Sequence, residues 1–377
     1  MTEQISNIDP EGLLEYSVVF TDRSLNHMSK KFQQVMKDLS SMLKQVYSAN
    51  GVAIVPGGGT FGMEAVARQF AMEEKCLIVR NGWFSFRWSQ ILEVGNIPSE
   101  TMVFKACPQD ESPQPAYAPA PIEKVTNAIL KDKPKVVFAP HVETSSGMIL
   151  PDNYIKQLAT ATHSVGGLLI LDCIASGAMW VDMAELEIDV LISAPQKGWS
   201  STPCAGIVML GEKALEEIEN KESSSFSCDL KKWLRIMEAY EKGGHAYHAT
   251  MPTDGLKQLR DTILETKQLG FEKAKLAQQE LGTKVRELLA RHGYKSLAAE
   301  EFEAPGVIVS YTDDSSMQDS SKFAAEGLQI AAGVPLQCDE APNFKTFRIG
   351  LFGLDKLTNI NRTVSNLSTV LSNISKT

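Results

Sequence analysis

The sequence has few of the features that mark secreted, membrane or metal-binding chains. Its six cysteines, at positions 76, 107, 173, 204, 228 and 338, form no C-x-x-C pair. This pattern favours a reduced, cytoplasmic chain without a disulfide framework or a metal site. No apolar run approaches the roughly 20 residues that a membrane helix needs. The first residues also lack the basic and apolar regions of a secretory signal, so we expect no membrane association.

Charge and length narrow the class of protein further. The chain has 377 residues and a formal net charge of −9, which disfavours nucleic acid or an anionic membrane as the main partner. Its 43% hydrophobic and 22% charged residues are ordinary for a globular protein. The length predicts two or three domains with cores large enough to fold without disulfides.

Short apolar strands alternate with amphipathic helices over the first two thirds of the chain. The predicted helices cover residues 28–49, 60–72, 122–132 and 153–166. The predicted strands cover residues 51–57, 76–82, 134–141, 167–173, 189–196 and 205–211. This alternation favours an α/β fold with a mostly parallel sheet between helices. Ligands of such sheets bind beyond the carboxyl ends of the strands, so the residues that follow each strand are candidate site residues.

The alternation weakens after about residue 255. A long charged helical stretch covers residues 254–293, and short strands at 304–312 and 344–353 and a final helix follow. This pattern predicts a smaller C-terminal α+β domain. The predicted division is an N-terminal arm over residues 1–16, a large domain over 17–269 and a small domain over 270–377.

A glycine-rich segment, VPGGGTFG, joins the first predicted strand of the sheet to a helix. Gly57, Gly59 and Gly62 have the spacing of a dinucleotide fingerprint. An NADP-dependent reductase is therefore one alternative, with Arg80 meeting the 2′-phosphate. The acidic residue of that fingerprint is missing after the second strand, however. Such a loop can also hold a single phosphate at the N-terminus of a helix.

Polar residues follow two later strands of the predicted sheet. Asp172 ends an apolar run. Either it is a buried carboxylate, which needs a partner, or it caps a short helix that begins at residue 173. Lys197 follows the next strand and can lie beside Asp172 at the same sheet edge. A lysine, a carboxylate, a phosphate loop and an aromatic residue suit pyridoxal 5′-phosphate (PLP). These groups can bind its aldehyde, ring nitrogen, phosphate and ring face, respectively.

Two segments, DCIASGAMW and DVLISAPQKGWSSTP, resemble the cofactor segment of fold-type I, class-V aminotransferases. The resemblance covers nearly the whole chain and is strongest for the alanine–glyoxylate and serine–pyruvate branch. It implies that Lys197 holds PLP as an internal aldimine, a Schiff base, and moves a proton, and that Asp172 pairs with the pyridinium nitrogen. The further cofactor contacts that it implies come from Gly58, Gly59, Thr60, Phe84, Thr144, Ile174 and Gln196. Trp83, next to Phe84, leaves open which of the two rings stacks on the cofactor.

Two later segments carry the rest of the resemblance. In AYHATMPTD, Tyr247 and Thr250 match residues that reach the phosphate of a neighbouring subunit, which implies a homodimer with shared active sites. In FRIGLFG, Arg348 matches an arginine that binds the substrate carboxylate bidentately. His27 is expected to border the substrate. From the residues alone, Tyr247 and Thr250 could instead begin a helix, and Arg348 could point outward from an edge strand.

The predicted function is transfer of an amino group from a small amino acid, such as alanine or serine, to a 2-oxo acid such as glyoxylate or pyruvate. One alternative on the same scaffold is a PLP-dependent lyase or desulfurase. A desulfurase needs a reactive cysteine on a mobile loop, and Cys338, in VPLQCDEAP, is the loop candidate. The NADP-dependent reductase remains a second alternative, although it leaves Asp172 and Lys197 without a role.

Overall fold

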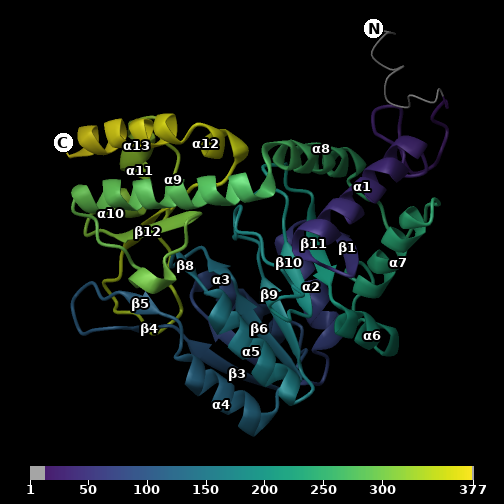
Figure 1. Ribbon diagram of the computed structural model, residues 1–377, viewed down its shortest axis with the longest axis horizontal. Helices are drawn as coiled ribbons and strands as arrows, with labels where there is room; N and C mark the ends of the chain where they lie inside the picture. Colours follow the sequence, from purple (N-terminus) through teal and green to yellow (C-terminus); the bar gives the residue numbers. More distant parts are fainter. Residues whose placement is uncertain (1–12, 376–377) are drawn as a thin grey trace.

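The computed structural model describes residues 13–375, so most of the predicted N-terminal arm lies outside the described residues. A seven-stranded sheet in the order β1-β11-β10-β9-β6-β2-β3 forms the centre of the larger part (Figure 1). Its strands are β1 (Gly51–Pro56), β2 (Lys75–Arg80), β3 (Glu100–Lys105), β6 (Val136–Pro140), β9 (Leu168–Asp172), β10 (Val190–Ser193) and β11 (Ala205–Leu210). Neighbouring strands are parallel except for β11, which is antiparallel to both β1 and β10. The prediction of a mostly parallel sheet is confirmed.

Helices cover this sheet because its strands are apolar on both faces. Every residue of β6, β9, β10 and β11 is buried, as expected for strands covered on both sides. The helices of this part are α1 (Lys30–Tyr47), α2 (Gly59–Phe70), α3 (Trp83–Val94), α4 (Ile122–Asp132), α5 (Asp152–Ser164), α6 (Glu212–Asn220), α7 (Leu230–Glu241) and α8 (Thr253–Leu269). The α2 helix packs against β10 and β11, α5 against β9, and α7 against β1.

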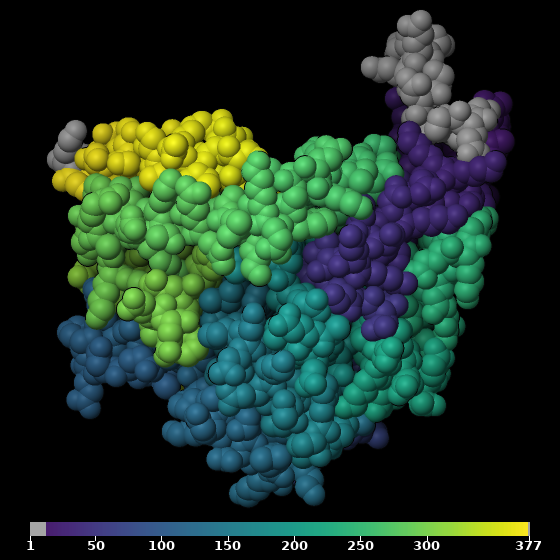
Figure 2. All heavy atoms as spheres, in the orientation of Figure 1, coloured from purple at the N-terminus to yellow at the C-terminus, as the bar shows by residue number. Residues whose placement is uncertain are grey.

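The C-terminal part has a small sheet and its own apolar core. Its strands, in the order β12-β14-β13, are β12 (Val307–Tyr311), β14 (Thr346–Gly350) and β13 (Ala331–Ala332). Its helices are α9 (Phe271–Arg291), α10 (Ser315–Gln318), α11 (Ser321–Ala325), α12 (Leu354–Thr358) and α13 (Ile360–Ile374), with a short 3₁₀ turn at Glu300–Phe302. Apolar residues of α9, α13, β12 and β14 form one buried cluster. Figure 2 shows α13 lying over α9, away from the N-terminal segment of the described chain.

The long helix predicted over residues 254–293 is wrong in one respect, because the structure divides it into α8 and α9. Gly270 separates them with a backbone φ of 98°, a left-handed value that favours glycine and breaks the helix. The α8 helix packs against α1, whereas α9 packs against α13 and β12. The division into domains at this point stays a prediction.

Two short antiparallel ribbons accompany the larger sheets. One pairs β4 (Cys107–Pro108) with β5 (Tyr117–Ala118), and the other pairs β7 (Val142–Glu143) with β8 (Met148–Ile149). The β7 strand follows β6 closely, so its residues lie near the carboxyl end of the main sheet. Over residues 13–375, no helix is long and apolar enough to cross a membrane.

Candidate active site

A cavity of about 180 Å³ lies where β9 and β10 end and α2 begins. The predicted site residues that line it are Gly59, Thr60, Phe84, Thr144, Asp172, Ile174, Gln196 and Lys197. The other lining residues are Met63, Arg87, Val142 and Ala175. Parallel strands place their carboxyl ends at one edge of the sheet, which explains how residues so far apart in sequence meet here.

Asp172 is the last residue of β9 and is buried against the sheet edge. It pairs in register with Ile192 of the parallel strand β10. One carboxylate oxygen, Oδ1, accepts a hydrogen bond from the Ile174 backbone N–H at 2.9 Å. Burial raises the pKa of Asp172 to about 7, and nearby Glu143 adds to the rise. Residues 173–181 form turns, so the alternative in which Asp172 caps a helix is wrong.

Lys197 lies in the turn after β10 and lines the cavity with Asp172. Its Nζ lies 5.3 Å from the centre of the Phe352 ring, a cation–π contact. Burial lowers the pKa of Lys197, and the positive charges of Arg348 and Arg87 lower it further. The amine therefore loses its proton more readily than a lysine in water does, as a nucleophile or base requires.

The N-terminus of α2 faces the same cavity through Gly59 and Thr60. The first backbone N–H groups of a helix have no partner within the helix, so they are available to an anion. Gly58 precedes α2 and does not line the cavity, and apart from Gly58 and its two chain neighbours no atom lies within 4 Å of the position that its Cβ would occupy. This open space beside free N–H donors fits a phosphate. Together with Lys197 and Asp172, the donor set fits the phosphate, aldehyde and ring nitrogen of PLP.

The first turn of α3 positions an aromatic residue at the cavity. Phe84 lines the cavity, whereas the neighbouring Trp83 packs on Phe86, with ring centres 5.9 Å apart. The buried carboxylate of Glu143 caps this turn, because it accepts hydrogen bonds from the backbone N–H groups of Phe84 at 3.1 Å and Ser85 at 2.8 Å. Glu143 also accepts from the hydroxyl groups of Ser85 and Ser145. The structure thus favours Phe84 over Trp83 as the ring beside the cavity.

Arg348 lies on β14, close to the cavity although not among its lining residues. Because β14 is the central strand of the small sheet and Arg348 is 9% exposed, the alternative of an outward residue on an edge strand is wrong. Its Nε donates to the Ala332 carbonyl oxygen at 2.7 Å, which leaves the two Nη groups to bind a ligand. The guanidinium carbon lies 5.4 Å from the centre of the Phe84 ring.

His27, Tyr247 and Thr250 lie together but do not line the cavity. The ring centres of His27 and Tyr247 are 5.5 Å apart, and the Tyr247 and Thr250 hydroxyl groups are hydrogen-bonded at 3.1 Å. Tyr247 is 52% exposed, whereas His27 is buried. Since α8 begins at Thr253, neither Tyr247 nor Thr250 starts that helix. The structure therefore divides the predicted site residues between a cavity and a separate patch.

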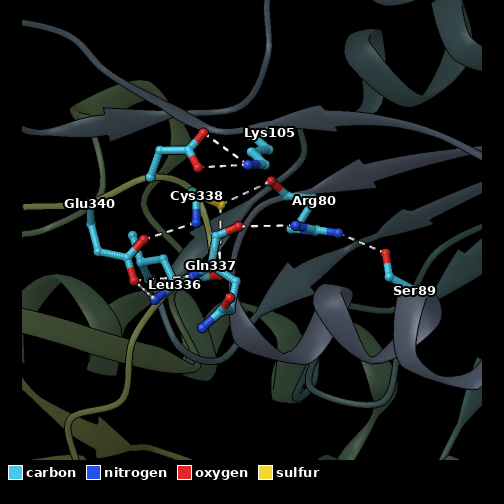
Figure 3. Close-up of polar contacts among 8 residues, drawn as sticks. Arg80, Ser89, Lys105, Leu336, Gln337, Cys338 and Glu340 are labelled. Carbon is cyan, nitrogen blue, oxygen red and sulfur yellow. Dashed lines mark hydrogen bonds and ion pairs between the residues drawn. The ribbon is translucent and has the colours of Figure 1, made fainter. Parts of the chain in front are cut away.

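The reductase alternative depends on Arg80 and the desulfurase alternative on Cys338, and both side chains are already engaged (Figure 3). Arg80 is buried, and it donates to the Gln337 carbonyl oxygen at 3.2 Å and to Ser89 Oγ at 2.7 Å. Cys338 is 3% exposed, and burial raises the pKa of its thiol to about 12. A buried arginine is poorly placed for a 2′-phosphate, and a buried, protonated thiol is a poor nucleophile.

The chain belongs to the class-V aminotransferase family, whose sequence profile matches residues 13–350. It is accordingly an aminotransferase, which moves an amino group to a 2-oxo acid. The 2-aminoethylphosphonate–pyruvate transaminase of Vibrio vulnificus is 28% identical over 310 residues, covering 80% of this chain and 78% of the relative. The alanine–glyoxylate aminotransferase of Rattus norvegicus is 24% identical over 363 residues, covering 94% of this chain and 82% of the relative.

The fold of the chain is also that of a solved aminotransferase. The crystal structure of an alanine–glyoxylate aminotransferase from Nostoc sp. superimposes with a TM-score of 0.77 at 18% identity, covering 92% of this chain and 88% of that one. The predicted family and fold, and the prediction of an aminotransferase, are thereby confirmed. The lyase, desulfurase and reductase alternatives are not favoured.

Proposed function

We propose that this aminotransferase uses PLP to move an amino group from a small amino donor, such as alanine or serine, to glyoxylate or pyruvate. The observation that carries the proposal is the cavity that joins Lys197, Asp172 and the N-terminus of α2. Relatives named for alanine and glyoxylate and for 2-aminoethylphosphonate and pyruvate support small substrates. Six free cysteines support a reducing, cytoplasmic environment.

The residues of the cavity suit distinct parts of PLP. The N-terminus of α2 with Gly58, Gly59 and Thr60, together with Gln196, would hold the phosphate. Phe84 and Ile174 would pack on opposite faces of the ring, and the Thr144 hydroxyl would approach the phenolic oxygen. When bound, PLP supplies an aldehyde and a pyridine ring that draws electrons from the substrate's α-carbon. Residues at both ends of the cavity would thus fix the position of one small, planar, anionic molecule.

Lys197 and Asp172 would carry out the proton chemistry. Burial and two neighbouring arginines lower the pKa of Lys197. Its Nζ can therefore take a proton from the α-carbon of the substrate and then donate that proton to a neighbouring carbon. Asp172 would accept a hydrogen bond from the protonated ring nitrogen. The low-dielectric surroundings that raise the pKa of Asp172 also strengthen its attraction to a cation there.

We further propose a homodimer with shared active sites. The patch of His27, Tyr247 and Thr250 does not line the cavity of its own subunit, which supports a role at the cavity of a neighbouring one. In that arrangement the hydroxyl groups of Tyr247 and Thr250 would reach the phosphate, and His27 would border the substrate. The exposed Tyr247 ring would then be covered by the second subunit.

A donor screen tests the proposed function. The purified protein with PLP is incubated with serine or 2-aminoethylphosphonate and either glyoxylate or pyruvate as acceptor, and the new amino acid is quantified. Alanine is paired with glyoxylate alone, because its transfer to pyruvate regenerates the starting pair. We expect transfer from at least one donor. That donor should also bleach the visible absorbance band of the protein with PLP when no oxo acid is present. A protein that gives neither a band with PLP nor transfer to either oxo acid would contradict the proposal.

Removing Arg348 should weaken the binding of carboxylate substrates selectively. We expect Arg348→Ala to lose roughly 2–5 kcal/mol of binding, because the guanidinium is largely desolvated and would pair directly with the substrate carboxylate. The loss should appear mainly as a raised KM for both the amino acid and the oxo acid. Arg348→Lys, which keeps the charge but not the planar fork, should have a KM between those of the wild type and Arg348→Ala. Wild-type kcat/KM in Arg348→Ala would exclude this role.

A further inference from the structure

Arg87 is a cavity residue to which the proposed function assigns no role. It lies on α3, one helical turn after Phe84, and its guanidinium carbon is 5.3 Å from the centre of the Phe84 ring. Its Nη1 donates a hydrogen bond to Thr60 Oγ1 at 3.0 Å. The side chain therefore connects α3 with the first turn of α2, across the part of the cavity where the helix N–H groups lie.

The hydrogen bond from Arg87 determines what the Thr60 hydroxyl can do. A hydroxyl has one hydrogen to donate and two lone pairs that accept. Because Thr60 Oγ1 accepts from Arg87, its own hydrogen is left to donate to another group at the start of α2. The remaining N–H groups of the guanidinium supply further donors and a permanent positive charge. Three kinds of donor thus meet at this point: helix N–H groups, a hydroxyl and a guanidinium.

The charge of Arg87 is not neutralised within the described part of the chain. None of the ion pairs between described residues includes Arg87, although its side chain is partly buried. Burial raises the pKa of Asp172 and the charge of Arg87 offsets only part of that rise, since the two side chains form no ion pair within 4.0 Å. A partly buried cation without a carboxylate partner favours binding of an anion beside it.

We infer that Arg87 is a positioning residue for the cofactor's phosphate, which it serves by orienting the Thr60 hydroxyl and by adding positive charge at the N-terminus of α2. This inference rests on the proposed use of PLP. A phosphate with two negative charges matches this donor set better than a carboxylate does, because the site combines a helix N-terminus with a guanidinium. Arg348, on another element, remains the group for the substrate carboxylate.

Binding of PLP and of pyridoxal, which lacks the phosphate, tests the inference. The full-length chain is freed of cofactor by dialysis, and both ligands are titrated by visible absorbance. Arg87→Met removes the charge, Arg87→Lys keeps it without the fork, and Thr60→Val removes the hydroxyl at similar volume. Arg362→Gln, on an exposed part of α13, removes an arginine at a distance from the cavity and serves as the control. Inorganic phosphate is the competing probe.

We expect Arg87→Met to weaken PLP binding roughly 10- to 100-fold, as loss of charged hydrogen bonds does, and to leave pyridoxal affinity unchanged. Arg87→Lys should recover part of the loss, Thr60→Val should show a smaller loss, and phosphate should compete less well in each variant. Equal losses of affinity for PLP and for pyridoxal would instead show that Arg87 acts on the Phe84 ring and the cofactor's ring rather than on the phosphate. That result would overturn the inference. So would unchanged PLP affinity in Arg87→Met or Thr60→Val. A wild-type chain that gives no band with PLP would contradict the proposed function itself.

Discussion

Lys197→Ala is expected to abolish the visible absorbance band of covalently bound cofactor and to lower kcat by roughly 10²–10⁴-fold or more. Lys197 combines two roles that no other cavity residue can fill, since it is the one lysine that lines the cavity in the described chain. In the proposed function it would be both the nucleophile that bonds covalently to the cofactor and the base that moves the proton of the substrate's α-carbon. Losing both removes the largest single contribution to the reaction.

Borohydride reduction locates the covalent bond directly. The reduced wild-type protein should carry the cofactor's mass on the peptide that contains Lys197, and Lys197→Ala should carry none. Lys284→Ala is the control, because Lys284 lies on the exposed side of α9 and pairs with Glu280. A Lys197→Ala protein that carries the cofactor's mass on a different lysine-containing peptide after borohydride reduction and dialysis would assign the bond to that other lysine. An added amine that partly restores turnover of Lys197→Ala would support the role as base.

The sequence was sufficient for the part of the site that lies on the main sheet. Asp172 ends a strand whose other residues are all apolar, and Lys197 follows a strand that is apolar up to Ser193. Such strands are typical of a parallel sheet covered on both faces. Parallel pairing of β9 with β10 then places both residues at the same edge, as the register of Asp172 with Ile192 shows. The convergence therefore follows from local patterns and from one general property of parallel sheets.

The sequence was not sufficient for α3, and Arg87 was missed with it. The first residues of this helix are rich in aromatics, and Gly82 at its N-cap position has no side chain to form a cap. The cap comes from Glu143, 61 residues further along the chain than Gly82, which accepts from the N–H groups of Phe84 and Ser85. A Cβ on Gly82 would lie 2.1 Å from Ser145 Oγ, so the close approach requires glycine. Because the N–H groups of Phe84 and Ser85 are capped from a distant segment, the one local signal is Ser85, whose Oγ accepts a hydrogen bond from the Gly82 N–H at 3.1 Å.

Had the sequence predicted a helix over residues 83–94, Arg87 would have followed as a candidate site residue. Residues three apart lie on the same face of a helix, so an arginine three positions after Phe84 faces the same cavity. The division of the C-terminal helical stretch at Gly270 is a different case. There the glycine is visible in the sequence, but its left-handed backbone conformation, with a φ of 98°, is seen only in the structure.

Asp172→Asn is expected to lower kcat by roughly 10²–10³-fold, the usual effect of removing one preorganised electrostatic contact from a reacting centre. Asparagine has nearly the same shape and can still accept the hydrogen bond from the Ile174 N–H. What it lacks is the negative charge that would stabilise a protonated ring nitrogen. The variant should therefore bind PLP, retain its covalent bond to Lys197 and fail mainly in removal of the α-proton. Unchanged kcat would show that the ring nitrogen does not depend on Asp172.

The same substitution should make the cofactor-free protein more stable at alkaline pH. Burial raises the pKa of Asp172 from 3.8 to about 7, so between these values the folded chain binds more protons at this site than the unfolded chain does. The free energy of unfolding therefore falls as pH rises from about 4 to about 7, by up to roughly 4 kcal/mol. The asparagine side chain of the variant cannot ionise, so the variant avoids this loss.

Urea unfolding of cofactor-free wild type and Asp172→Asn between pH 4.5 and 8.5 measures the difference. The variant should be the more stable protein at pH 8.5, and its advantage should shrink as pH falls. Asp313→Asn, at an exposed position, should show no such trend. Added PLP should then stabilise the wild type more than the variant, because a cationic ring nitrogen offsets the cost of the buried carboxylate. A stability difference that does not change with pH would mean that Asp172 stays ionised in the cofactor-free protein. If the wild type is the less stable protein at high pH without PLP but gains more stability than the variant when PLP is added, the same buried charge destabilises the empty site and stabilises the occupied one.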